Sequence, residues 1–228
     1  MNLHILEPDR WPGVVADRLD AAARAGSTLC LPTGATPRTA YAQLGLQGDL
    51  SRASVFLLDE FVLPNGAAAR CDTMLRRDLL DRLKHQPDRL ETWDTMAPDL
   101  EAECARMTDA INGAFDVAVL GIGTNGHLGL NEPGSSVASR ARVVDLHRST
   151  QQASTAYGTG PPPERGVTFG LADIMDAAAV WLLATGTHKA SIVAEALEGA
   201  VDTKVPASVL QQHPDLHVFL DRDAASAL

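Results

Sequence analysis

Short apolar runs alternate with stretches of helical periodicity along almost the whole chain. The apolar runs are candidate β-strands, at residues 3–6, 28–31, 55–59, 117–120, 143–146, 180–184 and 218–220. The stretches between them have apolar residues at helical spacing, at residues 14–25, 39–44, 73–83, 100–111 and 189–197. This alternation predicts an α/β fold with a doubly wound, mostly parallel sheet and helices on both faces. We expect a single domain over residues 1–228.

Charge and cysteine content limit the partners that this chain can have. The formal net charge of −10 would repel a nucleic-acid backbone, so we expect no nucleic acid as a partner. No apolar run is long enough to cross a membrane, and the N-terminus lacks the pattern of a signal peptide. The three cysteines are widely spaced and indicate neither a disulfide framework nor a zinc site. We therefore expect a cytoplasmic protein with reduced thiols.

Residues that could carry chemistry follow four of the candidate strands, where doubly wound sheets bind their ligands. The first segment is LPTGATP, at residues 31–37, which predicts a tight turn into a helix. Backbone N–H groups at Gly34 and Ala35 would form a cradle for an anion such as phosphate. The hydroxyls of Thr33 and Thr36 would add donors. The alternative is a simple turn with a helix cap.

The second segment is LLDEFV, at residues 57–62, in which Asp59 and Glu60 are adjacent carboxylates at a strand end. Neighbouring residues of a strand point to opposite faces, so the two side chains cannot share one role. A partly desolvated carboxylate at this place would be a good general base. The alternative is that both are solvated.

The third segment is VAVLGIGTNGHLGLNEPG, at residues 117–134. It contains the G-x-G-x-x-G pattern of dinucleotide sites, but Gly129, Asn131 and Pro133 interrupt the helix that such a site requires. His127 and Glu132 lie in the same irregular loop, which indicates an oriented acid/base pair. A histidine that is merely hydrogen-bonded in a turn is the alternative. No second histidine or cysteine lies nearby, so we expect no metal.

The fourth segment is ATGTHKA, at residues 184–190, with Lys189 in the first turn of a helix. A lysine is unfavourable there because of the helix dipole, and a bound anion would offset this cost. An exposed surface lysine is the alternative. Between the third and fourth segments, residues 158–163 (GTGPPP), with 149–157 before them, are the most loop-like part of the chain. They predict either a surface connection or a cover over the site.

Taken together, the four segments resemble the glucosamine-6-phosphate deaminase/isomerase family in order and spacing. LPTGATP is similar to its phosphate loop, LLDEFV to its catalytic-base strand, GTNGHLGLNEPG to its ring-opening loop and GTHKA to its second phosphate segment. The stretches ERGVTFGLADI and VPASVLQQH look closer to the galactosamine-6-phosphate deaminase/isomerase branch. The resemblance covers nearly the whole chain from Leu31 onward. It implies the Rossmann-like fold of the deaminase/6-phosphogluconolactonase type.

The resemblance also implies a reaction, in which an amino-sugar 6-phosphate and water give a ketose 6-phosphate and ammonia without a metal or organic cofactor. His127 would open the pyranose ring, Glu132 would orient the imidazole, and Asp59 would move a proton from C2 to C1. The expected partner is this small sugar phosphate; a homo-oligomer is left open. The phosphate would be held by Thr33, Gly34, Ala35, Thr36 and Lys189.

Three features depart from the family pattern. Asn125 stands where many members have an aspartate, so the imidazole loses one negative neighbour. The arginine that helps to clamp phosphate has no counterpart, because Ala156 aligns with it, and we interpret Arg165 as its substitute. The effector site of allosteric members is represented only in part, by Ser135, Ser136 and Arg142. We therefore expect no activation by an amino-sugar phosphate.

Two alternatives remain to this interpretation. A 6-phosphogluconolactonase shares the fold and the phosphate site, but it usually has an Asp-Glu-Arg strand end and a G-x-D-G-H-T-A-S loop. Here Phe61 follows Glu60, and LGLNEP follows His127. A non-catalytic sugar-phosphate sensor of the same fold would normally carry a DNA-binding domain, and this chain has no basic region or helix-turn-helix segment.

Overall fold

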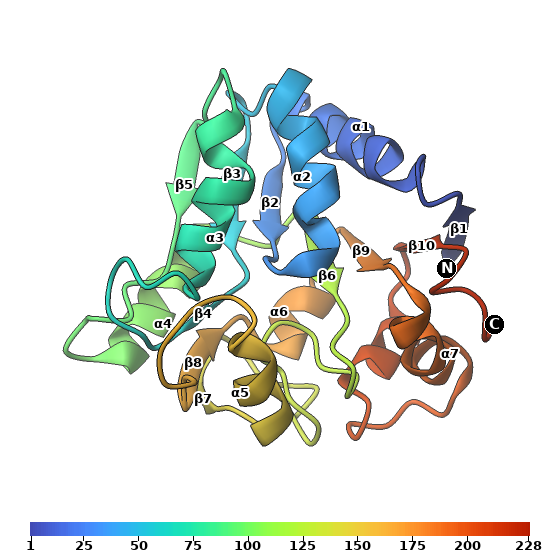
Figure 1. Cartoon of the computed structure of the whole chain (residues 1–228). Helices are drawn as coiled ribbons and strands as arrows, with labels where there is room; N and C mark the ends of the chain where they lie inside the picture. The colour runs from blue at the N-terminus through green and yellow to red at the C-terminus, as the bar shows by residue number, and fades with distance from the viewer.

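The alternating pattern produces a seven-stranded central sheet in the computed structural model, which describes residues 1–228 (Figure 1). The strand order is β1-β10-β9-β6-β2-β3-β5, and every neighbouring pair is parallel. The strands of this sheet are β1 (Asn2–Leu6), β2 (Thr28–Leu31), β3 (Ser54–Leu57), β5 (Arg89–Glu91), β6 (Val117–Gly121), β9 (Ala179–Ala184) and β10 (Leu216–Asp221).

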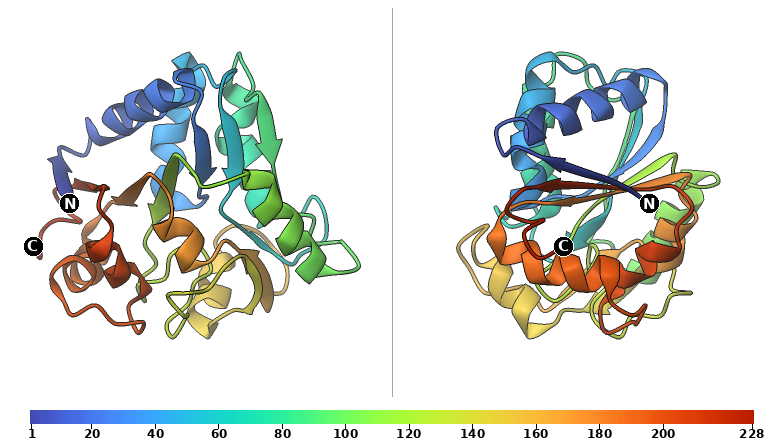
Figure 2. Two further views of the ribbon diagram at one scale, coloured as in Figure 1. Left: turned by 180° about the vertical axis from the view of Figure 1, so that it is seen from behind. Right: turned by 90° about the vertical axis from the view of Figure 1, so that its right-hand side faces the viewer.

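Helices cover both faces of this sheet, as the views in Figure 2 show for α1 and α7. The α-helices are α1 (Trp11–Arg24), α2 (Ala35–Gln47), α3 (Cys71–Asp78), α4 (Leu100–Ile111), α5 (Arg148–Ser154), α6 (Leu171–Met175) and α7 (Ala190–Glu198). Short 3₁₀ turns are η1 (Leu80–Arg82), η2 (Thr187–Lys189) and η3 (Pro206–Gln212). The central strands are apolar throughout because both of their faces are buried, in one core cluster of 59 residues. The predicted doubly wound α/β class is confirmed.

A second, smaller sheet lies at the carboxyl ends of the central strands (Figure 1). It consists of β4 (Asp59–Phe61), β8 (Arg165–Thr168) and β7 (Arg142–Asp145), which pair antiparallel in the order β4-β8-β7. The candidate strand 55–59 is therefore wrong at its end, because the chain leaves the central sheet after Leu57 and Asp59 begins β4. The candidate strand 143–146 forms as β7, in this small sheet.

Other differences from the sequence prediction concern short elements. Strands β5 and β8 have only three and four residues, and polar ends hide them from a search for apolar runs. The candidate helix 73–83 is divided into α3 and η1 at Leu79. The stretch 149–157 is not irregular throughout, since α5 occupies most of it. No helix is both long enough and apolar enough to span a bilayer.

The order of the strands fixes where a ligand can bind. From β2 the sheet grows through β3 to β5, and from β6 it grows in the opposite direction through β9 and β10 to β1. The strands β2 and β6 are neighbours, so the direction of winding reverses between them. Loops that leave neighbouring strands in opposite directions open a crevice at such a point. The LPTGATP turn and the GIGTNGH loop both begin there.

Candidate active site

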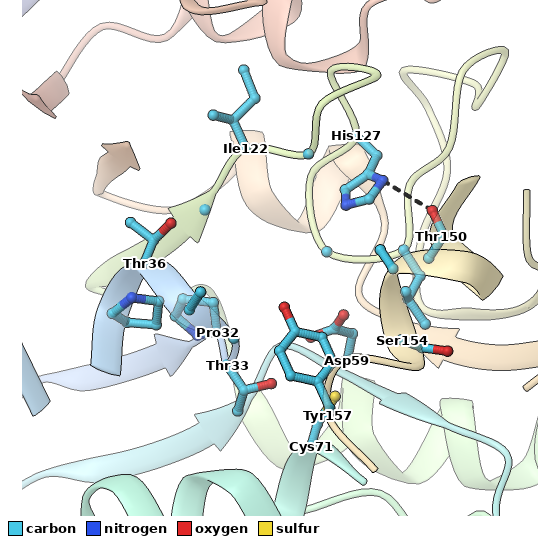
Figure 3. Close-up of a pocket in the computed structure, with 18 of the residues that line it drawn as sticks. Pro32, Thr33, Thr36, Asp59, Cys71, Ile122, His127, Thr150, Ser154 and Tyr157 are labelled. Carbon is cyan, nitrogen blue, oxygen red and sulfur yellow. Dashed lines mark hydrogen bonds between the residues drawn. The ribbon is translucent and has the colours of Figure 1, made fainter. Parts of the chain in front are cut away.

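A cavity of about 350 Å³ opens at this reversal point (Figure 3). Its size suits a small polar ligand. Its walls come from six places: the turn after β2, β4 with the residue before it, the start of α3, the loop after β6, α5 with the residues after it, and η2. The lining side chains used below are Thr33, Thr36, Asp59, His127, Thr150, Tyr157, His188 and Lys189, with backbone from Gly34, Ala35 and Gly123.

The turn after β2 presents the N-terminus of α2 to the cavity. Gly34 precedes the helix with φ of 110°, a conformation that glycine adopts without strain. Gly34 has no side chain to cap α2, and the Tyr157 hydroxyl lies at the backbone N–H of Ala35, so the remaining first N–H groups are left for another acceptor. Tyr41 supports the turn from below by donating to the carbonyl of Pro32 at 2.7 Å. The structure brings Thr33, Gly34, Ala35 and Thr36 together as one wall of the cavity.

Asp59 is buried at the floor of the cavity, where β4 begins. Burial, together with the neighbouring Glu60 carboxyl, raises the pKa of Asp59 to about 7. A carboxyl whose pKa lies near neutral pH can both accept and return a proton. The prediction that Asp59 and Glu60 face opposite ways agrees with the structure, since only Asp59 lines the cavity.

Glu60 points away from the cavity into a largely buried polar cluster at the start of α3. Its carboxylate accepts from the backbone N–H of Cys71 at 2.7 Å and of Asp72 at 2.8 Å. Burial raises the pKa of Glu60, while Arg70, 3.5 Å away, and these N–H groups oppose that effect. Glu60 therefore ties the strand that carries Asp59 to α3.

His127 lies on the opposite side of the cavity from the floor, and Figure 3 shows its ring and the Asp59 side chain directed at the same space. Its Nδ1 lies 3.4 Å from Oε2 of Glu132. The ring rests on Gly123, where a β-carbon would come within 2.5 Å of Cδ2, Cε1 and Nε2. Since Nδ1 is engaged with Glu132, Nε2 is the nitrogen left for a ligand.

Asn125 completes the support of the imidazole. Its Nδ2 donates to Oε2 of Glu132 at 3.0 Å, and its Oδ1 accepts from the backbone N–H of His127 at 3.2 Å. Burial alone would raise the pKa of Glu132, but hydrogen bonds from His127, Thr150 and Asn125 lower it to about 2. Glu132 is therefore ionised at neutral pH, and it favours a proton on Nδ1.

Lys189 reaches the cavity from η2, on the side of β9. Its Nζ donates to the carbonyl of Ile122 at 2.8 Å, in the loop after β6. Burial lowers the pKa of Lys189. The neighbouring His188 also lines the cavity. The structure thus brings Lys189 to the same cavity as the turn around Gly34, which gives that wall a positive charge.

Tyr157 lines the cavity beside the turn, and Figure 3 shows its ring next to Thr33 and Asp59. Its hydroxyl would lie 3.3 Å from a β-carbon on Gly34, so the oxygen sits close to the start of α2. Burial raises the pKa of Tyr157, which keeps the hydroxyl protonated and able to donate. Tyr157 is adjacent to Ala156, the position at which the family arginine is missing.

Arg165 is the predicted site residue that neither lines the cavity nor contacts His127, whereas Asn125 and Glu132 contact His127. It begins β8, and its side chain is 53% exposed. Its Nε lies 4.0 Å from Oδ1 of Asp145, on the surface of the small sheet. A residue at the outer end of this strand cannot face the turn after β2. Arg165 therefore does not take the place of the missing phosphate arginine in this structure.

The cavity residues that sequence reasoning missed include Thr150, Tyr157 and His188. Thr150 and Tyr157 lie in the stretch that lacks apolar periodicity, and no motif marks them. His188 stands next to Lys189 in a segment already singled out, so the histidine itself was an available signal. No cluster of three or more His, Cys, Asp or Glu side chains has the arrangement of a metal site.

Comparisons with known proteins agree on one family. Residues 13–218 match the sequence profile of the family described as glucosamine-6-phosphate isomerases/6-phosphogluconolactonase. A glucosamine-6-phosphate deaminase of Pseudarthrobacter chlorophenolicus is 42% identical over 211 residues, which cover 89% of this chain and 82% of that protein. A glucosamine-6-phosphate deaminase of an Arthrobacter species is 40% identical over 241 residues, which cover 100% of this chain and 93% of that protein.

Solved structures give the same grouping. A monomeric glucosamine-6-phosphate deaminase superimposes with a TM-score of 0.94 at 31% identity, and the match covers 100% of both chains. A 6-phosphogluconolactonase of Thermotoga maritima superimposes with a TM-score of 0.77 at 21% identity, over 97% of this chain and 99% of that one. The second likeness concerns the fold alone.

Proposed function

Because this chain belongs to the glucosamine-6-phosphate isomerase/6-phosphogluconolactonase family, we propose that it is a glucosamine-6-phosphate deaminase. The reaction converts glucosamine 6-phosphate and water to fructose 6-phosphate and ammonia. One observation carries this proposal: the Asp59 carboxyl and the His127 imidazole face one cavity, whose other wall is an uncapped helix N-terminus with a lysine.

Ring opening is assigned to His127. Nε2 accepts the proton of the C1 hydroxyl, the bond between C1 and the ring oxygen breaks as the C1 carbonyl forms, and the ring oxygen receives the proton from the imidazolium. Glu132 stabilises the transient imidazolium from the Nδ1 side, at 3.4 Å. A positioned acid/base group of this kind contributes about 10²–10⁴-fold to the rate.

Isomerisation is assigned to Asp59. Its carboxylate removes the proton from C2 while the C1 oxygen is protonated, which gives an enolamine. Return of the proton to C1 produces an iminium ion at C2, and water adds to that carbon before ammonia leaves. This sequence needs a proton carrier but no nucleophile or redox group, which agrees with a carboxyl whose pKa is about 7.

Phosphate binding is assigned to the wall formed by the turn and Lys189. The N–H groups at the start of α2 donate to no side chain of the N-cap residue Gly34, and they suit a dianion. Lys189 supplies charge, and Tyr157 supplies a donor near the turn. The global charge of −10 makes such a local positive wall necessary. Binding energy at this remote group would hold C1 and C2 against Asp59.

The proposal of the gluco epimer rests on the relatives of this chain and not on the shape of the cavity. Those described above carry the name glucosamine-6-phosphate deaminase, and this supports the gluco epimer over the galacto epimer. The monomeric state of the glucosamine-6-phosphate deaminase that superimposes with a TM-score of 0.94 supports activity without a second subunit. The three cysteines are buried and unpaired, which supports a location of this protein in the reducing cytoplasm.

An ammonia-release assay tests the proposal. Wild-type protein and Asp59→Asn are compared on the 6-phosphates of glucosamine, galactosamine and mannosamine. We expect release of ammonia from glucosamine 6-phosphate by the wild type, with at least about 10²-fold less activity in the variant. Hydrolysis of 6-phosphogluconolactone without ammonia release would instead support a lactonase. Binding of sugar phosphate without turnover of any substrate would support a sensor.

A further inference from the structure

The first turn of α5 and the residue before it contact His127 and the two side chains that support its ring, Asn125 and Glu132. Oγ1 of Thr150 lies 3.3 Å from Nδ1 of His127, the bond drawn in Figure 3. Ser149 Oγ lies 3.4 Å from Nδ2 of Asn125, and the backbone N–H of His147 lies 3.4 Å from Oε1 of Glu132. We propose that Thr150 is a positioning residue for ring opening, which acts by fixing the tautomer and orientation of His127.

Two side-chain oxygens lie beside Nδ1 of His127. An imidazole turns about its bond to Cβ, and a single partner 3.4 Å away leaves that rotation poorly fixed. Thr150 places a second oxygen at 3.3 Å from the same nitrogen. With Gly123 beneath the ring and two oxygens beside Nδ1, one orientation is favoured, and in it Nε2 faces the cavity.

The identity of residue 125 strengthens this role. The Asn125 side chain is neutral, so Glu132 is the only carboxylate beside the imidazole. Its ionised state depends on donors, and the Thr150 hydroxyl is one of them, along with Asn125 and His127. The Thr150 side chain is almost fully buried, so water cannot easily replace its hydroxyl.

A packing role alone makes a different prediction. If Thr150 only filled space, the isosteric Thr150→Val variant would behave as the wild type, because valine has the same shape. If the hydroxyl positions His127, Thr150→Val loses activity and Thr150→Ser keeps it. The proposal rests on the proposed function, since it assigns Thr150 to one step of that reaction.

The experiment measures kcat, KM and the deuterium isotope effect with glucosamine 6-phosphate that carries deuterium at C2. We expect about tenfold lower kcat in Thr150→Val with KM within twofold of the wild type, and kcat within about threefold in Thr150→Ser. Because ring opening precedes proton removal from C2, slower ring opening hides the later step. The isotope effect in Thr150→Val should therefore be no larger than that of the wild type.

Several outcomes would overturn this inference. Wild-type kcat in Thr150→Val would show that the hydroxyl is not needed. A larger isotope effect in that variant would place the defect at C2, with Asp59, and equal losses in the serine and valine variants would show that activity does not follow the hydroxyl. Binding of fructose 6-phosphate, measured by calorimetry, separates misfolding from a kinetic defect. If the wild type released no ammonia, that result would contradict the proposed function itself, whatever the Thr150 variants do.

Discussion

Gly123 and His127 are in contact in a way that only glycine permits, because a β-carbon at position 123 would lie 2.5 Å from three atoms of the imidazole. The glycine is therefore part of the geometry of the proposed acid/base group, although it carries no functional side chain. This relationship explains why the loop after β6 contains glycine where the ring must lie flat against the backbone.

Gly123→Ala should move the imidazole and impair catalysis. A methyl group at this place forces the ring to shift or to turn, and a misplacement of about 1 Å can cost about 10²-fold in rate. We expect kcat to fall by about that factor while the fold survives, because the ring borders an open cavity that can accept it. Steady-state kinetics and thermal unfolding measure the two effects.

The matched control is Gly13→Ala in α1, where a β-carbon meets nothing within 4 Å. Alanine is the better helix former, so this variant should be slightly more stable and fully active. Equal kcat in Gly123→Ala and in the wild type would contradict the assignment of His127.

Asp59→Asn should raise stability while it removes activity. The pKa of Asp59 is raised to about 7 in the folded state, whereas an unfolded aspartate titrates near 4. Between these values the native state holds the proton more tightly, so the carboxyl lowers stability as the pH rises from about 4 to about 7. Above a pH of about 7 the carboxyl is ionised in the folded state and lowers the stability by its full amount. The neutral amide of Asp59→Asn avoids this loss of stability.

Thermal unfolding across pH measures this effect. We expect the Tm of Asp59→Asn to exceed that of the wild type by several degrees at pH 8. The difference in Tm between the variant and the wild type should shrink as the pH is lowered toward 4, because the Asp59 carboxyl of the wild type then becomes neutral in the unfolded state as well as in the folded state. A gain in Tm that did not change with pH would mean that the burial of charge at Asp59 is not its cause.

The pH dependence of kcat/KM should show an acid limb with an apparent pKa of about 7. The proposed base must be ionised, and burial with the neighbouring Glu60 raises the pKa of Asp59 to this value. The substrate phosphate has its own second pKa near 6. Profiles from pH 5.5 to 9 distinguish the two, and a single limb near 6 would assign the dependence to the substrate rather than to the enzyme.

Tyr157→Phe should weaken binding of the phosphate and leave chemistry intact. A hydrogen bond to a charged group contributes about 1.5–3 kcal/mol, so loss of the hydroxyl near Gly34 should raise KM about tenfold or more. We expect kcat within about twofold of the wild type. The inhibition constant of inorganic phosphate should rise in parallel. An unchanged inhibition constant would place the hydroxyl outside the phosphate site.

The sequence predicted the parts of this structure that depend on periodicity and on residues with distinctive chemistry. The apolar strands of the central sheet and the helix at Leu100–Ile111 follow from patterns of buried residues. Asp59, His127 and Lys189 were found because a carboxylate, an imidazole and an ammonium at strand ends are unusual. The structure places all three around one cavity.

The remaining parts depend on contacts between distant segments, which a local pattern does not contain. The turn from the central sheet into β4 is fixed by pairing of Asp59 with Thr168, far along the chain. Thr150 and Tyr157 line the cavity because α5 packs beside it, and the local sequence does not specify where α5 packs. Arg165 was interpreted as a phosphate ligand for the same reason: the sequence shows its charge but not the direction of its side chain, which lies near Asp145 on the surface.

The boundary between the two sheets runs through the cavity. Asp59 belongs to the three-stranded sheet, and the loop of His127 is bound to that sheet where the N–H of Leu130 donates to Oγ1 of Thr168 at 3.3 Å. The turn at Gly34 belongs to the seven-stranded sheet. The cavity therefore takes its carboxyl from one sheet and its anion-binding turn from the other, so a substrate that contacts both spans the two sheets.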